Sequence, residues 1–154
     1  MTDRDSLVER LGRLAADRGA SIVTAESLTA GAIASALGQG PDSADWFRGG
    51  IVAYQEPVKF DVLGVPEGPV VSAACAEQMA RGARDLLGGS WAVSVTGVGG
   101  PDPSEGEPAG TVWMSVATED DVVTTKVQLD GEPAEVVEAT VDQALELLHD
   151  VLRR

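Results

Sequence analysis

Apolar residues recur at helical spacing in three long segments, and this pattern predicts the main helices of the chain. The segments are residues 5–18, 72–87 and 132–152. Gly19 follows the first segment as a helix stop, Ser72 is a good N-cap for the second, and Pro133 stands in the first turn of the third. A shorter helix is predicted over residues 28–37, and Pro57 begins another short one.

Short apolar runs rich in β-branched residues lie between these helices and predict buried strands. The runs are residues 20–25, 49–54, 91–95, 111–117 and 122–129. The last two are separated by an acidic turn at residues 119–121 and predict a hairpin. Because helices and strands alternate in the first half, we expect an α/β fold: a three-layer α/β/α sandwich with a mixed sheet and helices on both faces. The length predicts one domain over residues 1–154.

Ser27 lies where the first predicted strand turns directly into the helix predicted over residues 28–37. A helix N-terminus has free backbone N–H groups and the positive end of the helix dipole, so it favours an anion or a developing oxyanion. A serine at such a place is either a simple N-cap or a candidate nucleophile. Ser27 is therefore the candidate centre of a site.

Two other segments follow predicted strands and bear on the same site. These are residues 54–59 and the long glycine- and proline-rich loop 96–110. Loops of this length without structure of their own are often functional, and their glycines let the backbone approach a ligand closely. Since ligands of open α/β sheets bind beyond the carboxyl ends of the strands, the segments predict one common site.

A serine needs a base to act as a nucleophile near neutral pH. The only histidine, His149, lies near the end of the last predicted helix between packing positions, which argues against a Ser-His-Asp triad. A lysine can serve as base when burial lowers its pKa, and Lys59 is one of only two lysines against nine arginines. Lys59 is thus either a base or an ordinary solvated lysine. Tyr54, the only tyrosine, is either a proton relay or an amphipathic residue at a strand end.

The formal net charge of −14 argues against nucleic acid and anionic membranes as partners, although local N–H groups can still hold a small anionic ligand. The single Cys75 cannot form an internal disulfide, and no apolar run is long enough to span a bilayer or act as a signal, so we expect a cytoplasmic protein. No histidine–cysteine cluster, dinucleotide fingerprint or Walker loop is present. We therefore expect neither metal nor cofactor.

Three stretches together resemble the CinA C-terminal domain, the nicotinamide-nucleotide amidase family. Residues 24–31 read TAESLTAG and are similar to its TAESCTGG motif. Residues 47–65, with Tyr54 and Lys59, resemble its F-x-R-G-x-V-x-Y-x-N-x-x-K-x-x-L-G-V stretch. Residues 95–101 and 110–112 resemble its TGIAGP loop and the GTV that follows. Order and spacing match over nearly the whole chain.

The resemblance implies an α/β/α sandwich that hydrolyses nicotinamide mononucleotide to nicotinate mononucleotide and ammonia, and that self-associates into a homo-oligomer. It implies a serine nucleophile with tyrosine and lysine partners, which correspond to Ser27, Tyr54 and Lys59. The positions that it implies for contact with the pyridine nucleotide are Glu26, Thr29, Ala30, Gly31, Arg48, Thr96, Gly97, Gly99 and Gly100.

The chain departs from the family pattern at several positions. Leu28 stands in place of a cysteine, Ala30 in place of a glycine, and residues 131–137 lack both arginines of the family's stretch before the last helix. These departures favour one alternative, a catalytically altered or inactive relative that serves as a nucleotide-binding or assembly module. Short-chain dehydrogenases also use Ser, Tyr and Lys, but they place tyrosine and lysine one helical turn apart and open on a glycine-rich loop. Neither feature is present.

Overall fold

The computed structural model describes residues 2–154 and places five strands in one mixed sheet of order β2-β1-β3-β4-β5. The strands are β1 (Ile22–Glu26), β2 (Phe47–Val52), β3 (Trp91–Gly97), β4 (Thr111–Ala117) and β5 (Val122–Gln128). β1 pairs in parallel with β2 and β3, whereas β4 is antiparallel to β3 and β5 to β4. The carboxyl ends of the three parallel strands therefore meet at one edge, where Glu26 lies between Val52 and Val95.

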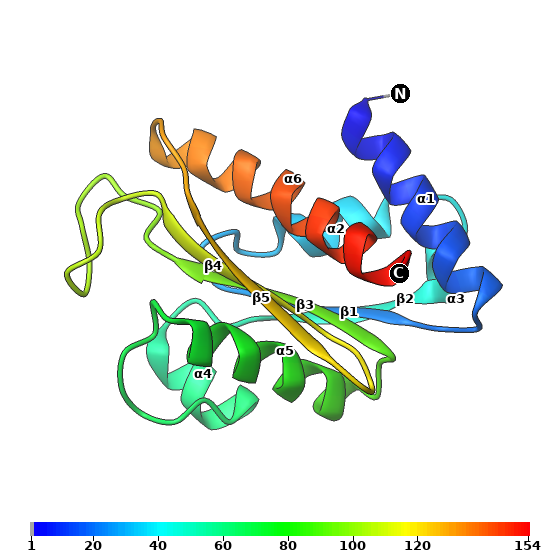
Figure 1. The fold of residues 1–154 in the computed structure, drawn as a ribbon, viewed down its shortest axis with the longest axis horizontal. Helices are drawn as coiled ribbons and strands as arrows, with labels where there is room; N and C mark the ends of the chain where they lie inside the picture. Colours follow the sequence, from blue (N-terminus) through cyan, green and yellow to red (C-terminus); the bar gives the residue numbers. More distant parts are fainter. Residues whose placement is uncertain (1) are drawn as a thin grey trace.

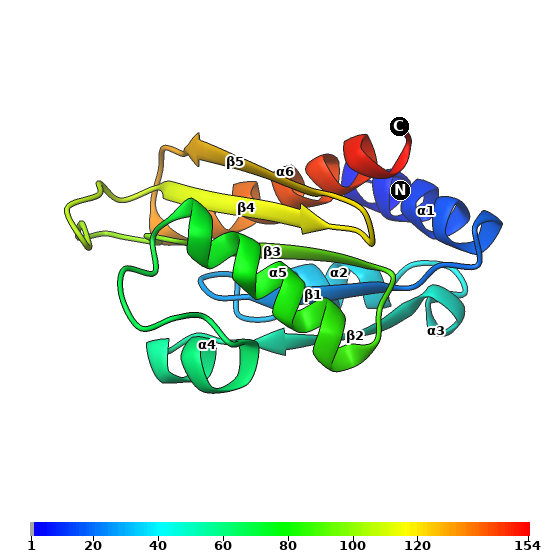
Figure 2. The same ribbon diagram turned by 60° about the horizontal axis from the view of Figure 1, so that its bottom comes forward.

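Helices cover both faces of the sheet, as Figures 1 and 2 show. One layer contains α1 (Asp3–Asp17), α2 (Ala32–Gly38) and α6 (Pro133–Leu152), and the other contains α4 (Glu56–Leu63) and α5 (Ala73–Leu87). The short α3 (Ser43–Trp46) leads into β2. These layers confirm the predicted three-layer sandwich, including its hairpin and its long last helix. Within residues 2–154, no helix has both the length and the apolar character needed to cross a bilayer.

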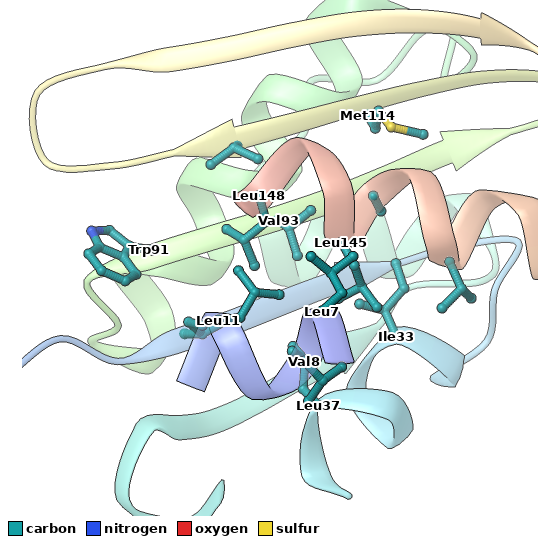
Figure 3. Packing of buried hydrophobic residues seen from close by; sticks show 14 of the residues in the cluster. Leu7, Val8, Leu11, Ile33, Leu37, Trp91, Val93, Met114, Leu145 and Leu148 are labelled. Atoms are coloured by element: carbon teal, nitrogen blue, oxygen red, sulfur yellow. The ribbon is translucent and has the colours of Figure 1, made fainter. Parts of the chain in front are cut away.

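Each face of the sheet has its own hydrophobic cluster. The cluster under α1, α2 and α6 contains Leu11, Ile33 and Leu145, all without exposed surface (Figure 3). The cluster under α4 and α5 contains Leu63 and Met79. Burial of such side chains contributes roughly 1.5–3 kcal/mol each, so both helix layers are firmly attached to the sheet.

The side chains of β1 alternate between these two clusters. Ile22 belongs to the cluster under α1, α2 and α6, whereas Val23 and Ala25 belong to the cluster under α4 and α5. Successive side chains of a strand point to opposite faces, so Glu26 points away from α4 and α5 and toward α2. The alternation thus places the Glu26 side chain on the sheet face opposite to α4.

The helix predicted over residues 28–37 begins later than expected, at Ala32. Ala30 and Gly31 have φ values of 48° and 99°, which are left-handed conformations that cannot continue a right-handed helix. The expectation that Ser27 stands at the helix N-terminus is therefore wrong. Residues 27–31 form a separate turn, and Gly31 is the N-cap of α2 without any side-chain cap.

Candidate active site

Ser27 follows the last residue of β1 at the carboxyl edge of the sheet and is 7% exposed. Its hydroxyl makes no hydrogen bond to any other part of residues 2–154. The N-cap interpretation does not apply to it, because Gly31 holds that position. A nearly buried hydroxyl that serves neither a cap nor a structural hydrogen bond is available for chemistry.

Glu26, next to it, serves the role that a capping side chain would have. This residue has no exposed surface, and its carboxylate accepts hydrogen bonds from the N–H of Ile33 at 2.8 Å and of Ala34 at 3.0 Å. The Thr29 hydroxyl donates to the same carboxylate at 2.6 Å, and Thr29 is 3% exposed. The first N–H groups of α2 are therefore already satisfied by the carboxylate of Glu26. The expectation that these N–H groups bind an anionic ligand is wrong.

The turn between Ser27 and α2 has backbone donors of its own. The N–H of Ala30 donates to the carbonyl of Ser27 and that of Ala32 to the carbonyl of Thr29, both at 3.0 Å. The N–H groups of Leu28, Thr29 and Gly31 have no acceptor in the described part of the chain. Unpaired N–H groups beside a left-handed residue form the type of concavity that binds an anionic oxygen.

Lys59 comes from α4, which follows directly after the carboxyl end of β2 (Figure 2). It is 2% exposed, and its Nζ donates to the carbonyl of Ala53 at 2.7 Å and to that of Tyr54 at 3.1 Å. The N–H of Ala53 in turn donates to the carbonyl of Glu26 at 2.7 Å. This chain of hydrogen bonds fixes the amine beside the strand end that carries Ser27.

Burial lowers the pKa of Lys59, while the charges of Cys75, Glu56 and Glu105 act in the opposite direction. With two N–H bonds directed at the carbonyls of Ala53 and Tyr54, the neutral amine retains a lone pair that can accept a proton. The alternative of an ordinary solvated lysine is excluded, because the side chain is almost completely inaccessible. A buried lysine with a lowered pKa has the properties that a general base requires.

Tyr54 lies in the short segment between β2 and α4, and it is 64% exposed. Its carbonyl helps to hold the Lys59 amine, whereas its phenol makes no hydrogen bond within residues 2–154. Val52, two residues earlier, is also exposed, at 47%. The relay role of this phenol stays a prediction.

Thr96 is the penultimate residue of the neighbouring strand β3, and it is 1% exposed. Its hydroxyl donates to the carbonyl of Val70 at 2.8 Å, which ties the strand end to the segment that leads into α5. Cys75, on the first turn of α5, is 2% exposed, and burial raises the pKa of its thiol. These polar groups lie on the same sheet face as Lys59 but serve mainly internal contacts.

The loop after β3 is held by a carboxylate at its tip. Glu105 accepts hydrogen bonds from the N–H of Val70, at 3.0 Å to the nearer oxygen, and from that of Val71 at 2.8 Å. Figure 1 shows this yellow-green loop extending beyond the sheet on the side of α4. The sequence indicated only a glycine- and proline-rich loop, and the fold reveals that Glu105 in it binds backbone N–H groups of another segment.

The predicted glycines of this loop differ in what surrounds them. A Cβ at Gly97 would lie 2.4 Å from the carbonyl oxygen of Thr111, so this glycine is required by strand packing. Gly100 has a φ of 89°, and a Cβ there would contact Ala109 at 3.0 Å. Gly99 has open space around it. Of the three, Gly99 has the backbone that a ligand can approach most closely.

Arg48 is not brought together with the other predicted residues. It stands at the start of β2, beside the beginning of β1, whereas Ser27 lies past the opposite end of β1. Its guanidinium donates to the carbonyl of Leu87 at the end of α5. A strand rises about 3.3 Å per residue, so Arg48 lies roughly 13 Å from the carboxyl end at Val52. The side chain fastens two structural elements far from the candidate site.

The described residues contain no group of three or more histidine, cysteine, aspartate or glutamate side chains arranged to hold a metal ion.

Comparisons with known proteins match this architecture. A family model described as the CinA C-terminal domain matches residues 4–152. The chain is 41% identical to the nicotinamide-nucleotide amidohydrolase PncC of Pseudomonas putida, over 92% of each chain. It is 39% identical to a CinA-like protein of Frankia casuarinae over 96% of its own length, but spans only 35% of that protein. A crystal structure of a CinA superfamily protein from Klebsiella pneumoniae has a TM-score of 0.94, 32% identity and 99% coverage of both chains.

Proposed function

The chain belongs to the CinA C-terminal domain family, and we propose that it is an amidohydrolase that converts nicotinamide mononucleotide to nicotinate mononucleotide and ammonia. The observation that carries this proposal is that the uncommitted hydroxyl of Ser27 and the buried amine of Lys59 both follow the carboxyl ends of two adjacent parallel strands, β1 and β2. The relative from Pseudomonas putida is a nicotinamide-nucleotide amidohydrolase by name, and its similarity over 92% of both chains supports the proposal.

In the first half of the reaction, the neutral amine of Lys59 takes the proton from Ser27, and the serine Oγ attacks the carboxamide carbon of the substrate. The C–N bond then breaks, and the proton passes from Lys59 to the departing nitrogen, which leaves as ammonia. The product of this half is an ester between Ser27 and the nicotinate carbonyl.

In the second half, Lys59 takes a proton from water, and the hydroxide oxygen attacks the ester carbon. The Ser27 oxygen leaves and recovers the proton from Lys59. One amide and one water are consumed, and one carboxylic acid and one ammonia are formed. The enzyme returns to its initial state, so no cofactor is required.

Each attack places negative charge on the former carbonyl oxygen. The unpaired N–H groups of Leu28, Thr29 and Gly31 are the best candidates to hold it, because they belong to the turn that begins at the nucleophile itself. One such donor typically contributes about 10²–10³ in turnover. Of the remaining predicted contacts, Ala30 belongs to the same turn, Gly99 to the loop after β3, and Tyr54 to the exposed segment after β2.

The proposal is tested by incubating the purified protein with nicotinamide mononucleotide and measuring ammonia and nicotinate mononucleotide together. Equal amounts of the two products are expected. Release of free nicotinamide would mean cleavage of the glycosidic bond and would contradict the proposal. Binding of the mononucleotide without any release of ammonia would favour the alternative, a nucleotide-binding or assembly module.

A further inference from the structure

We infer that Glu26 is the positioning residue of this site: its carboxylate holds the turn that presents both the Ser27 hydroxyl and the unpaired N–H groups behind it. The inference rests on the proposed role of Ser27 as nucleophile. It assigns to Glu26 a role through other residues and not a contact with the substrate, because Glu26 has no exposed surface.

The three groups that donate hydrogen bonds to the Glu26 carboxylate come from the turn and from the helix that follows it. Thr29 lies within it, while Ile33 and Ala34 belong to the first turn of α2. The carboxylate therefore joins the end of β1 to the start of α2 across the five residues of the turn. Two backbone hydrogen bonds also brace the turn, from Ala30 to the carbonyl of Ser27 and from Ala32 to that of Thr29. The carboxylate adds the bonds that tie the turn to α2 and to the end of β1.

The chemistry of this position calls for a carboxylate in particular. Its two oxygens accept from all three donors, and the negative charge lies at the positive end of α2. A glutamine offers only one oxygen, and its NH₂ group would face an N–H donor. An aspartate is shorter by one methylene and cannot reach α2 from the same backbone position. Neither replacement can satisfy the three donors together.

The placement of Glu26 also links this network to the base. The carbonyl of Glu26 accepts the N–H of Ala53, whose own carbonyl accepts the Lys59 amine. A single residue thus has its side chain bonded to the turn behind the nucleophile and its backbone bonded to the strand that orients the base. A displacement of Glu26 changes the distance between Ser27 and Lys59, and misplacement by about 1 Å typically costs about 10²-fold in rate.

The test compares Glu26→Gln and Glu26→Asp with the control Ser94→Ala. Ser94 is equally buried and donates to the carbonyl of Ala76 between β3 and α5, so the control removes one internal hydrogen bond outside the site. Each variant is assayed well below its Tm for kcat and KM with nicotinamide mononucleotide. In parallel, the rate at which an aryl sulfonyl fluoride modifies Ser27, with loss of fluoride, is followed by mass spectrometry.

We expect both Glu26 variants to lose about 10²-fold in kcat and in the rate of Ser27 modification, with KM changed by less than about threefold. Ser94→Ala should lower Tm without changing either rate. An unchanged rate of Ser27 modification, or a raised KM with unchanged kcat, would overturn the positioning role. If the wild-type Ser27 is modified quickly, both Glu26 variants slow this modification and no ammonia is released, the proposed substrate fails while the positioning role stands. If the wild-type Ser27 is not modified at all, the positioning role fails.

Discussion

Gly82 controls how closely α5 approaches α4, the helix that carries Lys59. A Cβ at this position would lie 2.2 Å from the carbonyl oxygen of Leu63, the last residue of α4. An ordinary contact is about 3.4 Å, so Gly82→Ala must push the two helices apart by about 1.2 Å. The obstacle is backbone and cannot turn away as a flexible side chain would.

The cost of this displacement follows from two opposing effects. Overpacking lowers the free energy of unfolding by up to about 3 kcal/mol, whereas alanine in place of glycine inside a helix raises it by about 1 kcal/mol. A net loss of about 2 kcal/mol lowers the Tm of a chain of this size by roughly 4–8 °C. Since Lys59 moves with α4, kcat should fall by about 10²-fold.

Gly38→Ala is the matched control, because Gly38 ends α2 with open space around its missing Cβ and no left-handed φ. It should leave both Tm and kcat unchanged or raise Tm slightly. Tm is measured by differential scanning calorimetry and kcat by ammonia release. If Gly82→Ala matches the control in both measurements, the α4–α5 contact does not set the position of Lys59, and the reasoning is refuted.

Three further predictions concern the base, the core and the far edge of the sheet. The value of kcat/KM should rise with pH through the pKa of Lys59, since only the neutral amine accepts a proton. Burial lowers that pKa, whereas the charge of Glu56 raises it. Glu56→Gln should therefore move the rising limb of the kcat/KM profile to lower pH. An immobile limb would exclude Lys59 as the titrating base. Thr24→Val should raise the free energy of unfolding in urea by about 1 kcal/mol, because the Thr24 hydroxyl is fully buried and unpaired among residues 2–154; a lower value would contradict this. Arg48→Ala should leave kcat/KM within about twofold, and a tenfold loss would show that Arg48 reaches the substrate.

Much of the fold was predictable because local patterns and tertiary packing agree. Ser72 was predicted as an N-cap, and its hydroxyl indeed accepts the N–H of Cys75 at 3.1 Å. The start of α2 was not predictable in the same way. Nothing in the letters of residues 28–31 shows that Ala30 adopts a left-handed conformation, which alanine rarely does. That conformation accompanies the Glu26 network, a contact that exists only after the turn has formed.

The candidate site likewise has features that the sequence predicts and features that only the fold reveals. The order of elements was enough to bring Ser27 and Lys59 to one edge, since both follow the carboxyl ends of adjacent parallel strands. The motif that contains Arg48 runs through the whole of β2, so its spacing alone does not tell which residues lie at the carboxyl end of the strand and which at the amino end. The role of Glu105 could not be predicted from the glycine- and proline-rich loop that contains it, because its backbone partners are more than thirty residues away in the sequence.

The central claim, that the Ser27 hydroxyl is the nucleophile, is tested most directly by Ser27→Ala. This substitution removes one oxygen that bonds to nothing else in residues 2–154, so the fold and Tm should remain unchanged within about 1 °C. The account predicts that the variant still binds nicotinamide mononucleotide but releases ammonia at least about 10³-fold more slowly than the wild type. Release of ammonia at the wild-type rate by a folded Ser27→Ala variant would contradict the account.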